Sequence, residues 1–140
     1  MDILLKSEVI GRLGCHHAGR TYVVPITYAY QSDYIYCHTK EGTKIEMMRQ
    51  NPHVCFEVDH IQNMANWQSI IIQGLYEELE GVESENALHV LVNRIMPLTT
   101  SETSQPKFGL DKVHIIRNPQ LKPVVFRLKI LERTGRFEKS

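Results

Sequence analysis

One hydroxyl and two amines gather in the segment Tyr34–Pro52, and together they suit the binding of a phosphate. Lys40, Thr43 and Lys44 fall in or just after a polar loop, at the expected start of a short helix. A helix start offers unpaired backbone N–H groups and the positive end of the helix dipole, which attract anions. The P-loop and Rossmann glycine motifs are both absent. A capped helix with exposed lysines is the alternative.

The segment Tyr22–Thr27 (YVVPIT) could hold a flat ligand. Its residues favour a strand, but Pro25 cannot donate a hydrogen bond within a sheet. A proline is tolerated at the edge of a sheet, where backbone groups can face something other than a strand. An edge strand without a ligand is the alternative for this segment.

Two other side chains could take part in such a site. His38 adjoins the proposed phosphate loop, where it could donate a hydrogen bond or carry a proton near neutral pH. Trp67 opens a long apolar stretch and could stack on a ring system. The alternatives are a structural histidine and a tryptophan that covers the end of the fold. No catalytic residue is predicted.

The cysteines and histidines do not predict a metal site or a disulfide. Cys15, Cys37 and Cys55 are far apart, without a C-x-x-C pair, so we expect them to be reduced. His16 and His17 are adjacent on an expected strand, and neighbouring strand residues point to opposite faces. Zinc needs three or four converging ligands, which these spacings do not supply.

Composition predicts one domain over residues 1–140 and excludes some functions. The chain is 42% hydrophobic, with 16 basic and 16 acidic residues and a formal net charge of zero. It shows no overall basicity that would indicate nucleic acid or an anionic membrane as partner. No apolar run is long enough for a signal peptide or a membrane span, so we expect a cytoplasmic protein.

The elements that must position these residues follow from residue patterns. The run Thr43-Lys44-Ile45-Glu46 fits a capping box that begins a helix, and Asn51-Pro52 ends it. His60–Asn66 reads as a loop, and Met96–Val113 has little regular pattern. Strands are predicted over Val9–Cys15, Thr21–Tyr30, Tyr34–His38, His53–Asp59, Trp67–Leu79 and Lys122–Arg133, with helices over Asp2–Lys6, Lys44–Gln50 and Ser84–Ile95.

This order favours a mainly β fold with helical insertions. About six strands are joined mostly by short turns, which fits a small antiparallel barrel. A doubly wound sheet would need regular alternation of strands and helices, which the chain lacks.

Several short motifs in this order resemble the pyridoxamine 5′-phosphate oxidase-like, FMN-binding split-barrel proteins, in particular the small members related to nitroimidazole-resistance proteins. The resemblance covers residues 8–80 well and the C-terminal part loosely. It rests on Gly11-Arg12-Leu13-Gly14, Val24-Pro25-Ile26-Thr27-Tyr28, Ile35-Tyr36-Cys37-His38-Thr39, Gly42-Thr43-Lys44, Asn51-Pro52 and Gly74.

The resemblance implies a six-stranded split barrel, a homodimer and FMN bound at the dimer interface. Thr43 and Lys44 would hold the FMN phosphate, and the isoalloxazine ring would lie along the strand that contains Pro25. Ser69 lies on the strand where the oxidases place a further flavin contact, and Trp67 would approach the flavin of either subunit. The full set of implied cofactor-binding residues is Tyr22, Val23, Val24, Pro25, Ile26, Thr27, Cys37, His38, Thr43, Lys44, Trp67 and Ser69.

Departures from the family pattern narrow the expected activity. The true oxidases carry an arginine where Tyr22 aligns and a lysine where Thr27 aligns, and their C-terminal basic segment is matched only by Arg133 and Arg136. We therefore do not expect oxidation of pyridoxamine phosphate. We expect an FMN-dependent oxidoreductase acting on a small molecule, with NAD(P)H as reductant and a nitro or quinone-like acceptor. A non-catalytic dimer that holds flavin or haem for storage or sensing is the alternative.

Overall fold

Seven strands form one antiparallel sheet in the order β2-β1-β5-β6-β7-β4-β3. The computed structural model describes residues 2–98 and 123–140. The strands are β1 (Ile10–His17), β2 (Arg20–Thr27), β3 (Ala29–Gln31), β4 (Tyr34–Thr39), β5 (His53–Asn63), β6 (Asn66–Leu79) and β7 (Val124–Glu138). The helices are α1 (Asp2–Ser7), α2 (Thr43–Gln50) and α3 (Gly81–Ile95), followed by a 3-10 turn at Met96–Leu98.

The two edges of this sheet are joined by the chain itself. β2 and β3 lie at opposite ends of the strand order, yet only Tyr28 separates them in sequence. The sheet therefore curls round and leaves a split between its edges, which confirms the mainly β, split-barrel fold. The expected strand Thr21–Tyr30 is wrong in one respect: it breaks at Tyr28 into β2 and β3, so the sheet has seven strands instead of six.

Tyr28 makes this corner because its polar groups are satisfied inside the protein. Its side chain is fully buried and packs edge-on against Phe56, with ring centroids 5.3 Å apart. Its backbone N–H donates to the carbonyl of Val9 at 2.9 Å, and its hydroxyl donates to the carbonyl of Leu5 at 2.8 Å. A buried corner with these hydrogen bonds cannot continue the ladder of β2.

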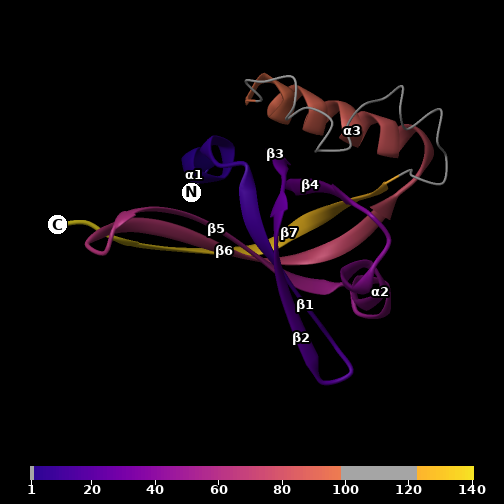
Figure 1. Cartoon of the computed structure of the whole chain (residues 1–140), viewed down its shortest axis with the longest axis horizontal. Coiled ribbons are helices and arrows are strands. Elements are labelled where there is room, and N and C mark those ends of the chain that lie inside the picture. The colour runs from indigo at the N-terminus through magenta and orange to yellow at the C-terminus, as the bar shows by residue number, and fades with distance from the viewer. Residues whose placement is uncertain (1, 99–122) are drawn as a thin grey trace.

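Helices close the interior of the barrel at two ends (Figure 1). Leu4 and Leu5 of α1 and Ile45 and Met48 of α2 are buried in the same apolar cluster as the inward-facing strand residues. Alternate residues of each strand point inward, as in the pattern of Leu13 and Cys15 on β1. The expected helix over residues 44–50 is confirmed, with one more residue at its start.

The outward faces of the sheet differ. α3 covers the face of β4 and β7, where Leu79, Ala87 and Val125 form a second buried cluster. Strand residues directly opposite each other share a face. The pairs Gly14↔Val23, Arg12↔Glu57 and Glu57↔Ile71 therefore place one outer face across β2, β1, β5 and β6.

β5, β6 and the end of β7 extend beyond the barrel as an arm (Figure 1), which two sequence predictions missed. His60–Asn66 was expected to be a loop, but β5 and β6 continue to Asn63 and from Asn66. The turn between them is held by the Asn63 side chain, which accepts a hydrogen bond from the Ala65 N–H at 2.9 Å. The chain after Arg133 was expected to be a tail, but β7 pairs with β6 as far as Glu138. The arm is exposed and its residues are mostly polar, so they lack the alternation of apolar and polar residues that predicts a strand.

The predictions for Met96–Val113 and for the start of the last strand fall mostly outside the described residues. No helix among residues 2–98 and 123–140 is long and apolar enough to cross a membrane.

Candidate functional site

The start of α2 differs from the capping box that the sequence predicts. Gly42, in extended backbone, is the residue before the helix, and no side chain forms a capping hydrogen bond. The first helical bond runs from the Glu46 N–H to the Gly42 carbonyl at 3.1 Å. Thr43 is therefore the first helical residue, one position too late to cap. The N–H groups of the first turn are left open to a ligand.

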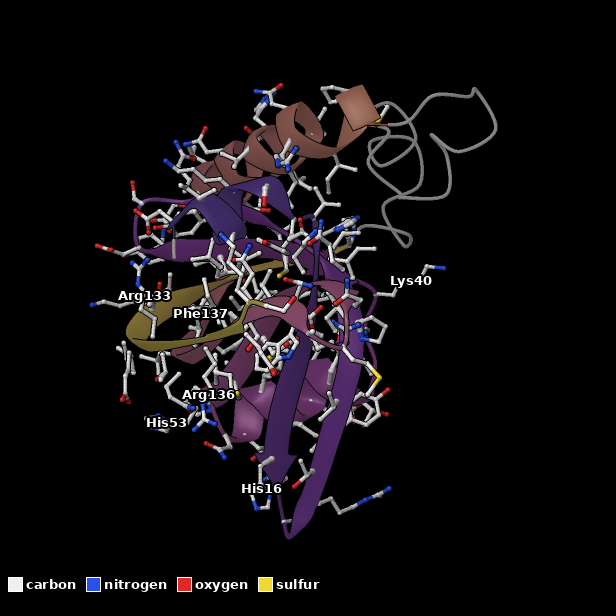
Figure 2. All side chains as sticks on the ribbon, turned by 90° about the vertical axis from the view of Figure 1, so that its left-hand side faces the viewer. His16, Lys40, His53, Arg133, Arg136 and Phe137 are labelled. Carbon is white, nitrogen blue, oxygen red and sulfur yellow. The ribbon has the colours of Figure 1, made fainter. Side chains whose placement is uncertain are left out.

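Lys44 and Thr43 flank this helix start. Lys44 is half-buried against β1. Burial raises the pKa of the Cys15 thiol on that strand, and the positive charge of Lys44 opposes this rise. Thr43 is exposed and lines a hollow of about 610 Å³ with His17 and Met47. Lys40, also in the loop, extends away from the ribbon into solvent (Figure 2). The structure thus groups a hydroxyl, an amine and free backbone donors at one point.

The predicted ring-binding strand lies beside this point. Tyr22 lies opposite Cys15 in the β1–β2 register, and Cys15 is close enough to Lys44 for its pKa to respond to the lysine charge. The first half of β2 is therefore one strand away from the part of β1 that adjoins Lys44. Among the described strands β2 pairs only with β1, which leaves its other edge open. The expectation that Pro25 marks an edge strand is confirmed. Tyr22, Val24 and Ile26 lie on the inward side of β2, and Val23, Pro25 and Thr27 lie on the outward side.

The split runs between β2 and the end of β4. β3 pairs with β4 only as far as Tyr36, so within the described chain residues 37–39 have no strand on that side. β2 and β4 come into contact across this gap. An open strand edge, a gap and a helix start therefore meet in one region.

The two predicted residues of β4 lie on opposite sides of the strand. The Cys37 side chain is fully buried in the core, and burial raises the pKa of its thiol. Only its backbone could reach a ligand in this arrangement. His38 is half-buried and opposite Val125, on the face that α3 covers.

The structure does not bring Trp67 and Ser69 to this region. Both lie on the arm, and the Trp67 ring N–H donates to Glu138 at 3.1 Å. Along β6, Trp67 lies roughly 26 Å from Leu75, which pairs with His53 just after α2. In one chain, the twelve predicted residues therefore fall in two separate places.

Sequence reasoning missed a polar cluster on the outer face. Arg12 of β1 donates to Asp59 at 3.1 Å and to Glu57 at 3.4 Å, beside a hollow of about 630 Å³ that Cys55 and His16 also line. Burial, together with a hydrogen bond and repulsion from Asp59, raises the pKa of Glu57 to about 7. Alternation over β5 could have placed Glu57 and Asp59 on one face, but only the register with β1 adds Arg12.

Within the described ranges, no group of three or more His, Cys, Asp or Glu side chains is arranged to hold a metal ion.

Comparisons with known proteins agree with the fold. A family model described as pyridoxamine 5′-phosphate oxidase matches residues 1–136. An uncharacterized protein of Rhizobium meliloti (strain 1021) is 35% identical over 74 residues, which are 53% of this chain. The alignment covers 49% of that relative, so the chain spans about half the length of the curated relative that it matches.

Two solved structures extend the comparison to nearly the whole chain. A FAD-binding protein from Mesorhizobium loti is 30% identical, with a TM-score of 0.72, and the alignment covers 99% of this chain and 92% of that one. A candidate 5-nitroimidazole antibiotic resistance protein from Bacteroides thetaiotaomicron is 22% identical, with a TM-score of 0.70 and coverage of 96% and 80%. Since the family model spans nearly all of the sequence, the chain belongs to the pyridoxamine 5′-phosphate oxidase family.

Proposed function

We propose that the chain is a flavin-binding oxidoreductase that holds FMN at the start of α2. The observation that carries the proposal is the uncapped helix start, with Thr43 and Lys44 beside it. The N–H groups of the first turn can each donate to a phosphate oxygen, and the Lys44 ammonium adds a charge-assisted contact. The family membership and the flavin named for the Mesorhizobium loti relative support the same ligand.

The open edge of β2 is the proposed support for the isoalloxazine ring. Within the described chain, the backbone N–H and C=O groups of Tyr22–Thr27 that point away from β1 have no partner strand, so they can pair with the polar rim of the ring, although Pro25 has no N–H to offer. The inward and outward side chains of β2 would bracket the ring from its two sides. When bound, the flavin would accept and pass on a hydride or electrons.

The proposed site is built from two copies of the chain. Trp67 and Ser69 lie too far from α2 to contact the same flavin, but the arm of a second copy could bring them there. The outer face also carries exposed apolar side chains that a homodimer would cover. They are Ile10, Val23, Ile61 and Ile71, which are 52%, 62%, 65% and 40% exposed.

Titration with three flavins tests the binding proposal. FMN and FAD both carry a phosphate next to the ribityl chain, whereas riboflavin does not. We expect FMN to bind at least about tenfold more tightly than riboflavin, because a charge-assisted phosphate contact is worth roughly 1.5–3 kcal/mol. Quenching of flavin fluorescence measures each dissociation constant. We call the first turn of α2, with Thr43 and Lys44, the phosphate seat. Equal affinities for FMN and riboflavin would contradict phosphate binding there, and no binding of any flavin would contradict the proposed function.

A second experiment tests catalysis. The flavin-loaded protein is mixed with NADH or NADPH without oxygen, and absorbance near 450 nm is followed. We expect bleaching by one of these donors and recovery of colour on addition of a nitro or quinone acceptor. If the colour remained stable with both NADH and NADPH, the result would favour the non-catalytic binding protein. Light scattering with and without FMN, at matched protein concentration, reports whether the loaded species is a dimer.

A further inference from the structure

We propose that Arg49 is a positioning residue for the phosphate seat, which it orders by tying the loop before α2 to the sheet. The inference rests on the proposed function, because it concerns how the same seat is held in shape. Arg49 lies in the last turn of α2, but its guanidinium reaches back to Glu41 before the helix start and lines the same hollow as Thr43. The role proposed for it is to hold the loop, and it is not itself a proposed phosphate ligand.

The Arg49 guanidinium joins two carboxylates with four hydrogen bonds. Towards the loop, Nη1 and Nη2 donate to the two oxygens of Glu41 at 3.0 and 2.8 Å. Towards the sheet, Nε and Nη2 donate to the two oxygens of Glu78 at 2.7 and 2.9 Å. A planar guanidinium suits this paired geometry, and lysine could not reproduce it.

The sheet side of this bridge is firmly anchored. The Tyr76 hydroxyl donates to Glu78 at 2.7 Å. Tyr76 is only 8% exposed, and its ring packs against that of Phe126. The Tyr76 backbone N–H also donates to the carbonyl of Pro52, which follows α2. Hydrogen bonds from Arg49 lower the pKa of Glu78, so this carboxylate stays ionised at neutral pH.

The loop side has little else to hold it. Among residues 2–98 and 123–140, no atom lies within 4 Å of the place where a Cβ on Gly42 would stand, so this residue is not packed against them. Lys40, Glu41 and Gly42 are all exposed. The side-chain hydrogen bonds of residues 40–42 that the described structure contains are those from Arg49 to Glu41. Without them, binding of a phosphate would have to order the loop, which weakens affinity.

The test compares FMN with riboflavin in Arg49→Gln, since only FMN uses the seat. We expect the preference for FMN to fall by about threefold to tenfold, the range expected when one segment must be immobilised on binding. Riboflavin affinity should stay the same. Arg49→Lys should recover little of the preference, because one ammonium cannot pair with both carboxylates. Arg127→Gln is the matched control, because Arg127 also bonds a carboxylate, that of Glu77 at 2.7 Å, but lies on β7 outside the proposed site.

The outcomes separate this inference from the function on which it rests. If the wild-type protein shows no preference for FMN over riboflavin, the phosphate seat itself is contradicted. A wild-type preference that Arg49→Gln retains overturns the positioning role alone. Equal weakening of FMN and riboflavin also overturns it, because that is the result of general loosening. Glu41→Gln should lower the preference as well, and adding it to Arg49→Gln should cause no further fall.

Discussion

The two ends of the barrel are closed by short helices, α1 and α2, that differ in their hydrogen bonding. At the α1 end, Arg94 of α3 donates to the carbonyls of Lys6 and Ser7 at 2.9 and 3.1 Å, which satisfies the last turn of α1. At the α2 end, the first turn of the helix receives no side-chain cap. Figure 1 shows α1 and α2 at opposite ends of the sheet.

This difference separates the structural role of both helices from the binding role that we propose for the start of α2. Both helices insert buried apolar side chains, such as Leu5 and Ile45, so both stabilise the barrel. Of the two helix ends compared, the start of α2 leaves backbone donors open beside a lysine and a hydroxyl, whereas the last carbonyls of α1 are bonded within the protein. A helix end that is satisfied by the protein has nothing to offer a ligand, whereas an unsatisfied end at the surface can bind an anion.

The largest expected effect is on stability at the α1 end. Leu5→Ala should lower the free energy of unfolding by about 2–5 kcal/mol, because it leaves a cavity in the core. The dissociation constant for FMN should be unchanged at temperatures where the variant is folded. Urea unfolding followed by circular dichroism, with an FMN titration in parallel, measures both. Weakened FMN binding by the folded variant would show that the α1 end also shapes the site.

At the α2 end, the main effect should be on binding. Lys44→Ala should weaken FMN binding by about tenfold to a hundredfold, from the loss of a charge-assisted contact worth roughly 1.5–3 kcal/mol. Stability should change little. Lys6→Ala, an exposed lysine in the last turn of α1, is the control and should leave both quantities unchanged. Unaltered FMN affinity in Lys44→Ala would refute the assignment.

The cap at the α1 end should have a moderate effect on stability alone. Arg94→Ala removes two hydrogen bonds to helix carbonyls, and we expect a loss of about 1–2 kcal/mol in the free energy of unfolding. FMN and riboflavin affinities should both be retained. Thermal unfolding with and without FMN provides the measurement. If Arg94→Ala changed the FMN-to-riboflavin ratio, the two ends would not be independent.

The last effect depends on pH and comes from the outer face, away from both ends. The pKa of Glu57 is about 7 in the folded chain, against 4.5 as its ordinary value. The folded state therefore holds the proton more tightly, and this stabilisation is present below pH 4.5 and lost as pH rises to about 7. Glu57→Gln should flatten that part of the stability profile. A slope that is the same in the variant would assign the pH response to other groups.

Much of the fold could be predicted from residue patterns. The alternation of Val54, Phe56 and Val58 indicates a strand because a half-buried strand repeats every two residues. The arm could not be predicted in the same way. Its polar residues at positions 60–66 are in strands only because β5 and β6 continue to pair beyond the core, and pairing leaves no local signal in an exposed hairpin.

The candidate site was predicted in part. The positions of Thr43, Lys44 and Pro25 follow from local rules about helix starts and edge strands. The capping box was wrong because a favourable motif was shifted by one residue, so that Gly42 precedes the helix. The separation of Trp67 from α2 could not be seen from the sequence, since it depends on how far β6 runs before it meets the helix.

The sequence by itself determined the strands and helices of the core and which residue types lie at the start of α2, because these depend on neighbours along the chain. The tertiary structure decided which groups meet: Arg49 with Glu41 and Glu78, Arg12 with Glu57 and Asp59, and Lys44 with β1. Apart from the contact between Arg49 and Glu41, which are eight residues apart, such contacts join strands and helices far apart in sequence. They depend on register and closure of the sheet, which no short stretch of residues specifies.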